Sequence, residues 1–284
     1  MGILYVVATP IGNLNDITFR ALETLKNVDI IACEDTRQTL KLLNHYEIKN
    51  KLVAYHKFNE KEKSNSLIND LKSGLNIAIV TDAGTPCISD PGYILIKEAH
   101  ENNIEVIGIP GASAVVTALS VSGLDTAQFS FIGFLPVDNT KFNQEIEKMK
   151  ASIINTFVLY ESPKRIVKLV NKLKEYFPNS NIYIASDLTK IHERGIFGKI
   201  ENVYEQIKND PNIEKGEYAI VLQKEENREE TVEEVSLEGL LVDTMVKNNC
   251  SSKEAIEILT SKNKNLKKND LKEASLNLKR LFDK

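Results

Sequence analysis

The chain has 284 residues, of which 42% are hydrophobic and 27% are charged, as is typical of folded globular proteins. This length is sufficient for two domains with a small appendage. The formal net charge of −4 argues against a protein that coats nucleic acid without sequence preference, and no apolar run is long enough to span a membrane. The four histidines and the three cysteines are scattered, so the sequence predicts neither a disulfide framework nor a metal site.

The first half of the chain alternates between strand and helix patterns. Apolar runs typical of buried strands occupy residues 3–8, 28–33, 52–55, 77–80 and 105–109. Helical patterns separate or follow them at residues 17–26, 36–43, 59–73, 93–102 and 112–122. This order predicts a mainly parallel sheet with helices on both faces. The first strand begins almost at the first residue with no basic leader before it, so we expect a cytoplasmic protein.

One loop stands out, because residues 82–92 read DAGTPCISDPG between a predicted strand and a predicted helix. Ordinary connectors have about 2–6 residues, and this one is longer. Its two glycines let the backbone pass close to a ligand, and its two prolines stiffen it. In open parallel sheets, ligands bind at the carboxyl ends of strands. We therefore interpret residues 82–92 as a binding loop rather than an ordinary connector.

Two other loops, at residues 9–16 and 110–113, also follow strands and contain both Gly and Pro. If their strands are neighbours in the sheet, the three loops line one crevice. The dinucleotide signature G-x-G-x-x-G and the phosphate-binding pattern ending in G-K-[ST] are both absent from the sequence. A fourth segment, EDTR at residues 34–37, allows two interpretations: Asp35 or Thr36 caps the following helix, or Asp35 and Arg37 meet a polar substrate at the mouth of the crevice.

A proline-bearing segment around residues 135–139 marks the passage to a second domain of mixed α/β structure. Ser162 is expected to cap a helix that has Pro163 as its first residue. The predicted domains are an N-terminal α/β domain at residues 1–120 and a C-terminal α/β domain at residues 121–226.

The last part of the chain is predicted to be a small helical module at residues 235–284, which follows an acidic linker at residues 224–234. Residues 251–254 read SSKE, a capping box. Residues 251–284 contain nine Lys or Arg and five Asp or Glu, which gives a local charge of +4. Because the net charge of the whole chain is −4, the remaining residues carry −8. Lysines cluster at Lys262, Lys264, Lys267 and Lys268. The module is either a solvated helical cap or an RNA-facing, phosphate-contacting appendage.

Seven motifs together resemble one known family. They read ATPIGNLNDIT at 8–18, EDTR at 34–37, DAGTPCISDPG at 82–92, PGASA at 110–114, GFLP at 133–136, ESPKR at 161–165 and LTK at 188–190. In this order and over nearly the whole chain, they resemble the ribosomal RNA small subunit methyltransferase I family of the tetrapyrrole methylase superfamily. The resemblance implies a tetrapyrrole methylase-like fold of two α/β domains, with S-adenosyl-L-methionine in the cleft between them.

The resemblance also implies an activity, partners and a binding site. The activity is 2′-O-methylation of the ribose of a cytidine in the decoding centre of 16S rRNA, with the small ribosomal subunit as partner, no membrane and a homodimeric assembly. By matched position, the residues around the cofactor are Pro10, Ile11, Asp82, Gly84, Thr85, Pro86, Ile88, Ser89, Ser113, Ala114, Tyr160 and Ala219.

Catalytic roles are hypotheses at this point. A base near the 2′-hydroxyl would help to remove its proton, and the candidates are Asp35, Glu161 and Lys190. Lys190 qualifies only if desolvation lowers its pKa. Arg37 and Arg165 are better suited to hold phosphates. The sulfonium donor is already activated, so no metal is expected.

Two alternatives remain open from the sequence. One is a methylase of corrin or porphyrin precursors that shares the fold. The other is a catalytically silent relative that binds RNA or the ribosome, and S-adenosylmethionine binding by the purified protein would distinguish it.

Overall fold

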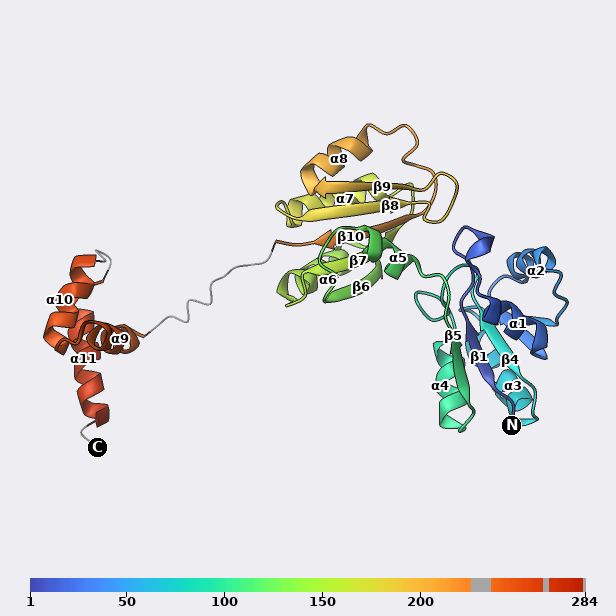
Figure 1. Ribbon diagram of the computed structural model, residues 1–284, viewed down its shortest axis with the longest axis horizontal. Helices are drawn as coiled ribbons and strands as arrows, with labels where there is room; N and C mark the ends of the chain where they lie inside the picture. Colours follow the sequence, from blue (N-terminus) through green and yellow to red (C-terminus); the bar gives the residue numbers. More distant parts are fainter. Residues whose placement is uncertain (226–235, 263–265, 283–284) are drawn as a thin grey trace. The chain divides into compact units, whose positions relative to one another are not determined.

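The computed structural model describes residues 1–225, 236–262 and 266–282. The chain forms two compact units, Met1–Glu225 and Glu226–Lys284 (Figure 1). The first unit contains two five-stranded sheets. None of the helices in the described part of the chain is long and apolar enough to cross a bilayer.

The first sheet consists of β1 (Leu4–Val7), β2 (Ile30–Cys33), β3 (Leu52–Ala54), β4 (Ile77–Val80) and β5 (Val106–Ile109). Their order across the sheet is β3-β2-β4-β1-β5, and every neighbouring pair is parallel. This confirms the parallel sheet that the alternating strand and helix patterns predict.

Helices cover both faces of this sheet. They are α1 (Phe19–Asn27), α2 (Thr36–His45), α3 (Glu60–Lys72) and α4 (Tyr93–Glu101), with a short 3-10 turn, η1 (Leu14–Asp16), before α1. Alternate strand residues point to opposite faces. Ile77 and Ile79 therefore pack in one core with residues of α3 and α4, whereas Ala78 and Val80 pack in the other with residues of α1 and α2.

Helix α5 (Ala114–Val121) follows the last strand of the first sheet but packs against the second sheet. Its buried residues Val115, Ala118 and Leu119 join one hydrophobic cluster with Val158 and Val221 of that sheet. The start of α5 is therefore fixed between the two sheets.

The second sheet consists of β6 (Phe129–Phe134), β7 (Thr156–Glu161), β8 (Asn181–Ser186), β9 (Arg194–Lys199) and β10 (Tyr218–Gln223). Its order is β6-β7-β10-β8-β9; β6 and β7 are parallel and the other neighbouring pairs antiparallel. The face opposite α5 is covered by α6 (Asn139–Ala151), α7 (Ile166–Tyr176) and α8 (Ile200–Lys208). The predicted start of α7 is wrong: residues 163–165 form a turn and the helix begins at Ile166. The predicted boundary between domains 1–120 and 121–226 stays a prediction, because both sheets fall within one compact unit.

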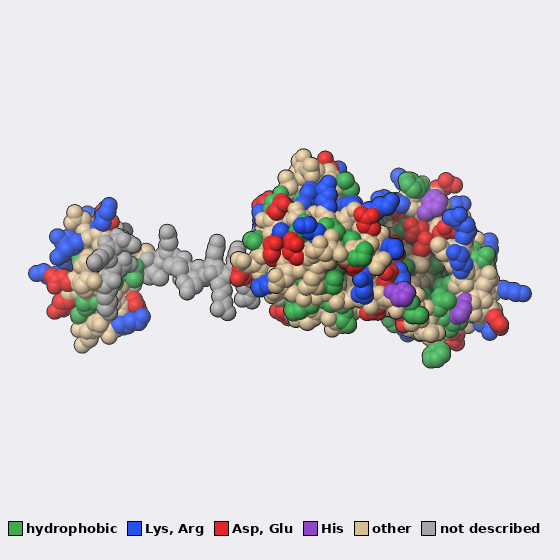
Figure 2. Space-filling view, turned by 90° about the horizontal axis from the view of Figure 1, so that it is seen from above, with side chains coloured by type: hydrophobic (Ala, Val, Ile, Leu, Met, Phe, Trp, Pro, Cys, Tyr) green, Lys and Arg blue, Asp and Glu red, His purple; other side chains and the backbone are tan. Residues whose placement is uncertain are grey.

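The second unit contains α9 (Leu237–Asn248), α10 (Ser252–Lys262) and α11 (Lys268–Phe282) around a hydrophobic core of its own that includes Leu241, Leu259 and Leu271. The capping box at its second helix is confirmed, since Ser251 N donates to Glu254 Oε2 over 2.8 Å and Glu254 N donates to Ser251 Oγ over 3.4 Å. Lys and Arg side chains alternate with acidic ones on its visible face (Figure 2). Residues 226–234 of the predicted linker, Lys264 and the side chain of Lys262 lie outside the described residues.

Lys224 stabilises the end of α6. Its side chain is buried, and Nζ donates hydrogen bonds to the carbonyl oxygens of Met149, Lys150 and Ser152. These carbonyls belong to the last turn of a helix, where no further backbone N–H is available. We expect Lys224→Met, which retains the apolar stem but donates no hydrogen bond, to lower the free energy of unfolding by about 1–3 kcal/mol. Urea denaturation of this variant, beside the exposed Lys168→Met as a control, measures the loss; equal midpoints would contradict this role.

Candidate active site

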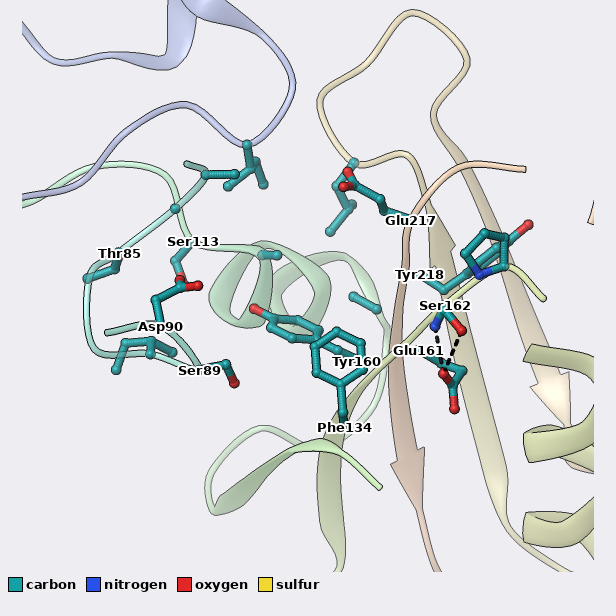
Figure 3. Close-up of a pocket in the computed structure, with 18 residues that line it drawn as sticks. Thr85, Ser89, Asp90, Ser113, Phe134, Tyr160, Glu161, Ser162, Glu217 and Tyr218 are labelled. Atoms are coloured by element: carbon teal, nitrogen blue, oxygen red, sulfur yellow. Dashed lines mark hydrogen bonds between the residues drawn. The ribbon is translucent and has the colours of Figure 1, made fainter. Parts of the chain in front are cut away.

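A cavity of about 420 Å³ lies where the loops of the first sheet meet the ends of β6, β7 and β10 in the second (Figure 3). Its size falls within the range of small-molecule sites. It is lined by Ile11, Ala83, Gly84, Thr85, Ile88, Ser89, Asp90, Ser113, Ala114, Phe134, Tyr160, Glu161, Ser162, Pro163, Leu188, Glu217, Tyr218 and Ala219.

The strand order explains why distant loops meet here. Strands β4, β1 and β5 are adjacent, so the loops at residues 82–92, 9–16 and 110–113 leave the sheet side by side. The sequence predicts one crevice if these three strands are neighbours, and the observed strand order meets that condition. Backbone hydrogen bonds join two of the loops: Thr9 N donates to Gly84 O over 2.8 Å, and Gly84 N donates to Thr9 O over 3.1 Å.

The loop at residues 82–92 has a strained backbone that its surroundings hold in place. Cys87 and Ser89 have φ angles of 72° and 71°, a region that side chains other than glycine rarely adopt. Glu60 of α3 fixes the end of the loop, because its Oε1 accepts the backbone N–H of Gly92 over 2.8 Å. Such strain is concentrated at functional sites.

Nine of the predicted cofactor residues line the cavity. They are Ile11, Gly84, Thr85, Ile88, Ser89, Ser113, Ala114, Tyr160 and Ala219. Among the described residues, the wall does not include Pro10, Asp82 or Pro86. Asp82 instead accepts the backbone N–H of Asp35 at Oδ1 over 3.0 Å. That any of these residues contacts a cofactor stays a prediction.

Asp35 and Arg37 adopt the capping arrangement that the sequence left open. Asp35 is the N-cap of α2, its Oδ1 accepts the N–H of Arg37 over 2.8 Å, and Arg37 Nη2 lies 2.6 Å from Asp35 Oδ2. The side-chain hydrogen bond from Arg37 is the largest influence that lowers the pKa of Asp35 to about 2. Such a carboxylate is a poor general base near neutral pH. Neither residue is part of the described cavity wall, and the Arg37 side chain is 85% exposed.

Lys190 lies between two carboxylates, with Nζ 2.7 Å from Asp187 Oδ1 and 2.8 Å from Glu217 Oε2. Partial burial acts to lower its pKa, but the two carboxylates outweigh burial and raise it. The condition for Lys190 to act as a base is therefore not met. Because Glu217 lines the cavity, Lys190 instead fixes the position of a wall residue.

Glu161 lines the cavity, but its carboxylate is already engaged. Its side chain is fully buried, and Oε2 lies 3.0 Å from Arg165 Nη2 as an ion pair without a hydrogen bond among the described residues. Oε1 accepts hydrogen bonds from Ser162 N over 2.7 Å and from Ser162 Oγ over 3.1 Å. Arg165 also donates to the carbonyl of Leu135 over 3.1 Å. This network fixes the turn before α7 and leaves Glu161 less suited to accept a proton from a substrate.

The cavity also contains residues for which the sequence predicted no role at the site. They are Ala83, Asp90, Phe134, Ser162, Pro163, Leu188, Glu217 and Tyr218. Asp90 is the most informative of them, because burial, followed by the charges of Glu34 and Asp82, raises its pKa to about 6 against an opposing hydrogen bond from Thr81. Its position in the binding loop could have indicated a role at the site, but the sequence Ser-Asp-Pro is also typical of an ordinary turn.

The wall chemistry fits S-adenosylmethionine. Ile11, Leu188 and Ala219 provide apolar surface, and Thr85, Ser89 and Ser113 provide polar groups for the hydroxyl, amino and carboxylate groups of the ligand. In the part of the chain that the structure describes, no group of three or more His, Cys, Asp and Glu residues could hold a metal ion. Independence of metal stays a prediction.

The fold and the cavity define a class of protein. A sequence profile described as Tetrapyrrole (Corrin/Porphyrin) Methylases matches residues 3–204. Among solved structures, diphthine synthase superposes with a TM-score of 0.60 at 15% identity, covering 78% of this chain and 90% of its own. Uroporphyrin-III C-methyltransferase from Thermus thermophilus, complexed with S-adenyl homocysteine, superposes with a TM-score of 0.53 at 16% identity, covering 78% and 97%. The chain has the tetrapyrrole methylase fold.

Curated relatives narrow this class. Many of them bear the name ribosomal RNA small subunit methyltransferase I, and three illustrate the degree of similarity. The protein of Halalkalibacterium halodurans is 47% identical over 78% of this chain and 76% of its own. That of Buchnera aphidicola subsp. Schizaphis graminum is 41% identical over 95% and 94%, and that of Bacillus subtilis is 42% identical over 90% and 88%. The chain therefore belongs to the ribosomal RNA small subunit methyltransferase I family and is a methyltransferase.

Proposed function

We propose that this protein uses S-adenosylmethionine to methylate the ribose 2′-oxygen of a cytidine in the decoding centre of 16S rRNA. The observation that carries the proposal is the cavity formed by adjacent loops of the first sheet, in a chain whose relatives at 41–47% identity are named for the small-subunit rRNA. The proposal includes the small ribosomal subunit as substrate, a homodimeric assembly and a cytoplasmic location.

The bound donor supplies a methyl group on a positively charged sulfur, which is reactive without further activation. The task of the protein is then to align this methyl group with the 2′-oxygen and to exclude water, and alignment alone is worth several kcal/mol of the barrier. The loops that contain Thr9 and Gly84, joined by two backbone hydrogen bonds, and the adjacent loop that ends at Ser113 are suited to hold the donor through backbone groups.

The two alternatives receive less support. The corrin and porphyrin methylases share the fold, but the uroporphyrin-III C-methyltransferases of Thermus thermophilus are 16–19% identical to this chain, far below its rRNA-named relatives. A catalytically silent ribosome-binding protein would not need to retain the strained loop and the formed cavity.

The experiment that tests the proposal compares cells with and without this protein. Mapping of 2′-O-methyl groups along 16S rRNA should show one ribose modification, on a decoding-centre cytidine, that disappears when the chain is deleted and returns when it is restored. Identical maps would contradict the proposal.

Arg37 provides a separate test of where the RNA enters. Its exposed guanidinium, oriented by Asp35, is suited to hold a phosphate outside the cavity. We expect Arg37→Ala to lower kcat/KM for the small subunit by about tenfold or more, while S-adenosylmethionine affinity is unchanged. Arg20→Ala, an exposed change on α1, is the control. Wild-type kinetics in the Arg37 variant would mean that the substrate enters elsewhere.

A further inference from the structure

Asp90 is a cavity carboxyl group that none of the site roles above employs. It lies on the strained binding loop, next to Ser89, and lines the cavity. Figure 3 shows Asp90 facing Tyr160 across the cavity, with the tyrosine hydroxyl pointing toward it. Tyr160 belongs to β7 of the second sheet, so Asp90 faces the space between the two sheets, where a ligand would be enclosed.

The groups around Asp90 disfavour its charged form. Burial is the largest cause of its raised pKa, and the carboxylates of Glu34 and Asp82 add to it, while the Thr81 hydroxyl opposes them. Tyr160 also faces Asp90, and burial, with the charge of Asp90 contributing, raises the pKa of Tyr160 and of Cys87 toward their neutral forms. Within the described residues, the groups that shift Asp90 include no cation. A carboxylate without a positive partner is a better proton acceptor than one held in an ion pair.

The other acidic and basic candidates are less suited to accept a proton. Asp35 is held in its charged form by Arg37. Lys190 is held protonated by Asp187 and Glu217. Glu161 lies beside the Arg165 cation, which favours its charged form, and its Oε1 accepts a hydrogen bond from Ser162 N.

We infer that Asp90 is the general base that accepts the proton of the substrate hydroxyl, an inference that rests on the proposed function. As the ribose 2′-oxygen forms its bond to the methyl carbon, the carbon–sulfur bond breaks and its electron pair stays on sulfur. The 2′-hydroxyl proton passes to the Asp90 carboxylate. The products are the 2′-O-methyl ribose, S-adenosylhomocysteine and protonated Asp90, which releases its proton to solvent before the next turnover.

The position of Asp90 also affects how the stability of the ligand-free protein depends on pH. The pKa of Asp90 is about 6 in the folded state, above its ordinary value of 3.8, so the folded state loses stability as pH rises through this interval. Asp90→Asn removes the charge and this penalty. The stability of the variant relative to wild type should therefore increase between pH 4 and pH 7, whereas a residue of purely structural importance would only lose stability when changed.

The test combines three measurements on the full chain. For Asp90→Asn, we expect methyl transfer to the small subunit to fall by about 10²–10⁴-fold. S-Adenosylmethionine affinity by calorimetry should stay within about twofold of wild type, since the loss concerns the chemical step. Thermal melts of the ligand-free protein at pH 4 and pH 7 should show the relative stabilisation described above. Glu101→Gln, an exposed carboxylate on α4, is the matched control and should change none of these.

Glu34→Gln provides a second variant that retains Asp90. Removal of a neighbouring charge should move the acid limb of the transfer rate, near pH 6 in wild type, to lower pH. Transfer by Asp90→Asn at the wild-type rate, or an acid limb unmoved in Glu34→Gln, would overturn the inference while leaving the proposed function intact. Loss of S-adenosylmethionine affinity in Asp90→Asn would overturn it in favour of a donor-binding role. A wild-type protein that transfers no methyl group to rRNA would overturn the proposed function, and the inference with it.

Discussion

Gly84→Val should abolish S-adenosylmethionine binding while the protein remains folded. Gly84 lines the cavity with a φ angle of +88°, and an added Cβ would lie 3.4 Å from Ile11 Cγ2, itself a wall residue. A branched side chain there would project toward the space that the ligand needs and would strain the backbone, a cost of about 1–3 kcal/mol. Calorimetric titration of S-adenosylmethionine measures the loss of binding.

A second glycine makes the control for this experiment possible. Gly74 has a similar φ angle of +104° and no atom within 4 Å of an added Cβ, and it lies in the turn between α3 and β4, away from the cavity. Gly74→Val should therefore cost a similar amount of stability and leave binding intact. Undiminished affinity in a folded Gly84→Val protein would place the donor outside this cavity.

The second large effect concerns the helical unit at the end of the chain. Lys267, Lys268, Lys272 and Lys279 are exposed there. Because each lysine that neutralises a phosphate releases counterions, four contacts contribute about 3 to the slope of log affinity against log salt concentration. We expect reversal of these four lysines to Glu to weaken binding to the small ribosomal subunit and to flatten its salt dependence by about that amount.

Charge reversal is a more specific test than truncation, because the charge-reversed unit retains its hydrophobic core around Leu241 and Leu271. The matched control reverses four exposed lysines of the first unit, Lys61, Lys72, Lys97 and Lys168, which changes the net charge equally. Identical salt slopes for the two quadruple variants would show that the helical unit is a solvated cap with no specific role in RNA binding.

The parallel sheet and its loops were predictable because their causes are local. Apolar runs such as residues 77–80 define buried strands, and Gly and Pro mark the loops at their carboxyl ends. The order β4-β1-β5 was not predictable, because strand order depends on packing between segments far apart in the chain. From the sequence alone, a shared crevice could therefore be predicted only on the assumption that these strands are neighbours. The position of α5 on the second sheet was missed for the same reason.

Site roles depended even more on distant partners. The raised pKa of Lys190 depends in part on Glu217, 27 residues away in the chain. The raised pKa of Asp90 depends first on burial and then in part on Glu34, which the adjacency of β2 and β4 brings near the loop. In contrast, the pairing of Asp35 with Arg37 is local, and the capping interpretation described it correctly. Local patterns thus identified the loops, whereas the assignment of a base required the folded structure.

The most direct measurement incubates the purified protein with methyl-labelled S-adenosylmethionine and small ribosomal subunits from cells that lack it, then locates the label by nuclease digestion and mass spectrometry. We expect stoichiometric label on the ribose of one decoding-centre cytidine, and none when Gly84→Val replaces the wild type. Label on a base, label at an unrelated site, or no transfer from a protein that binds the donor would contradict it.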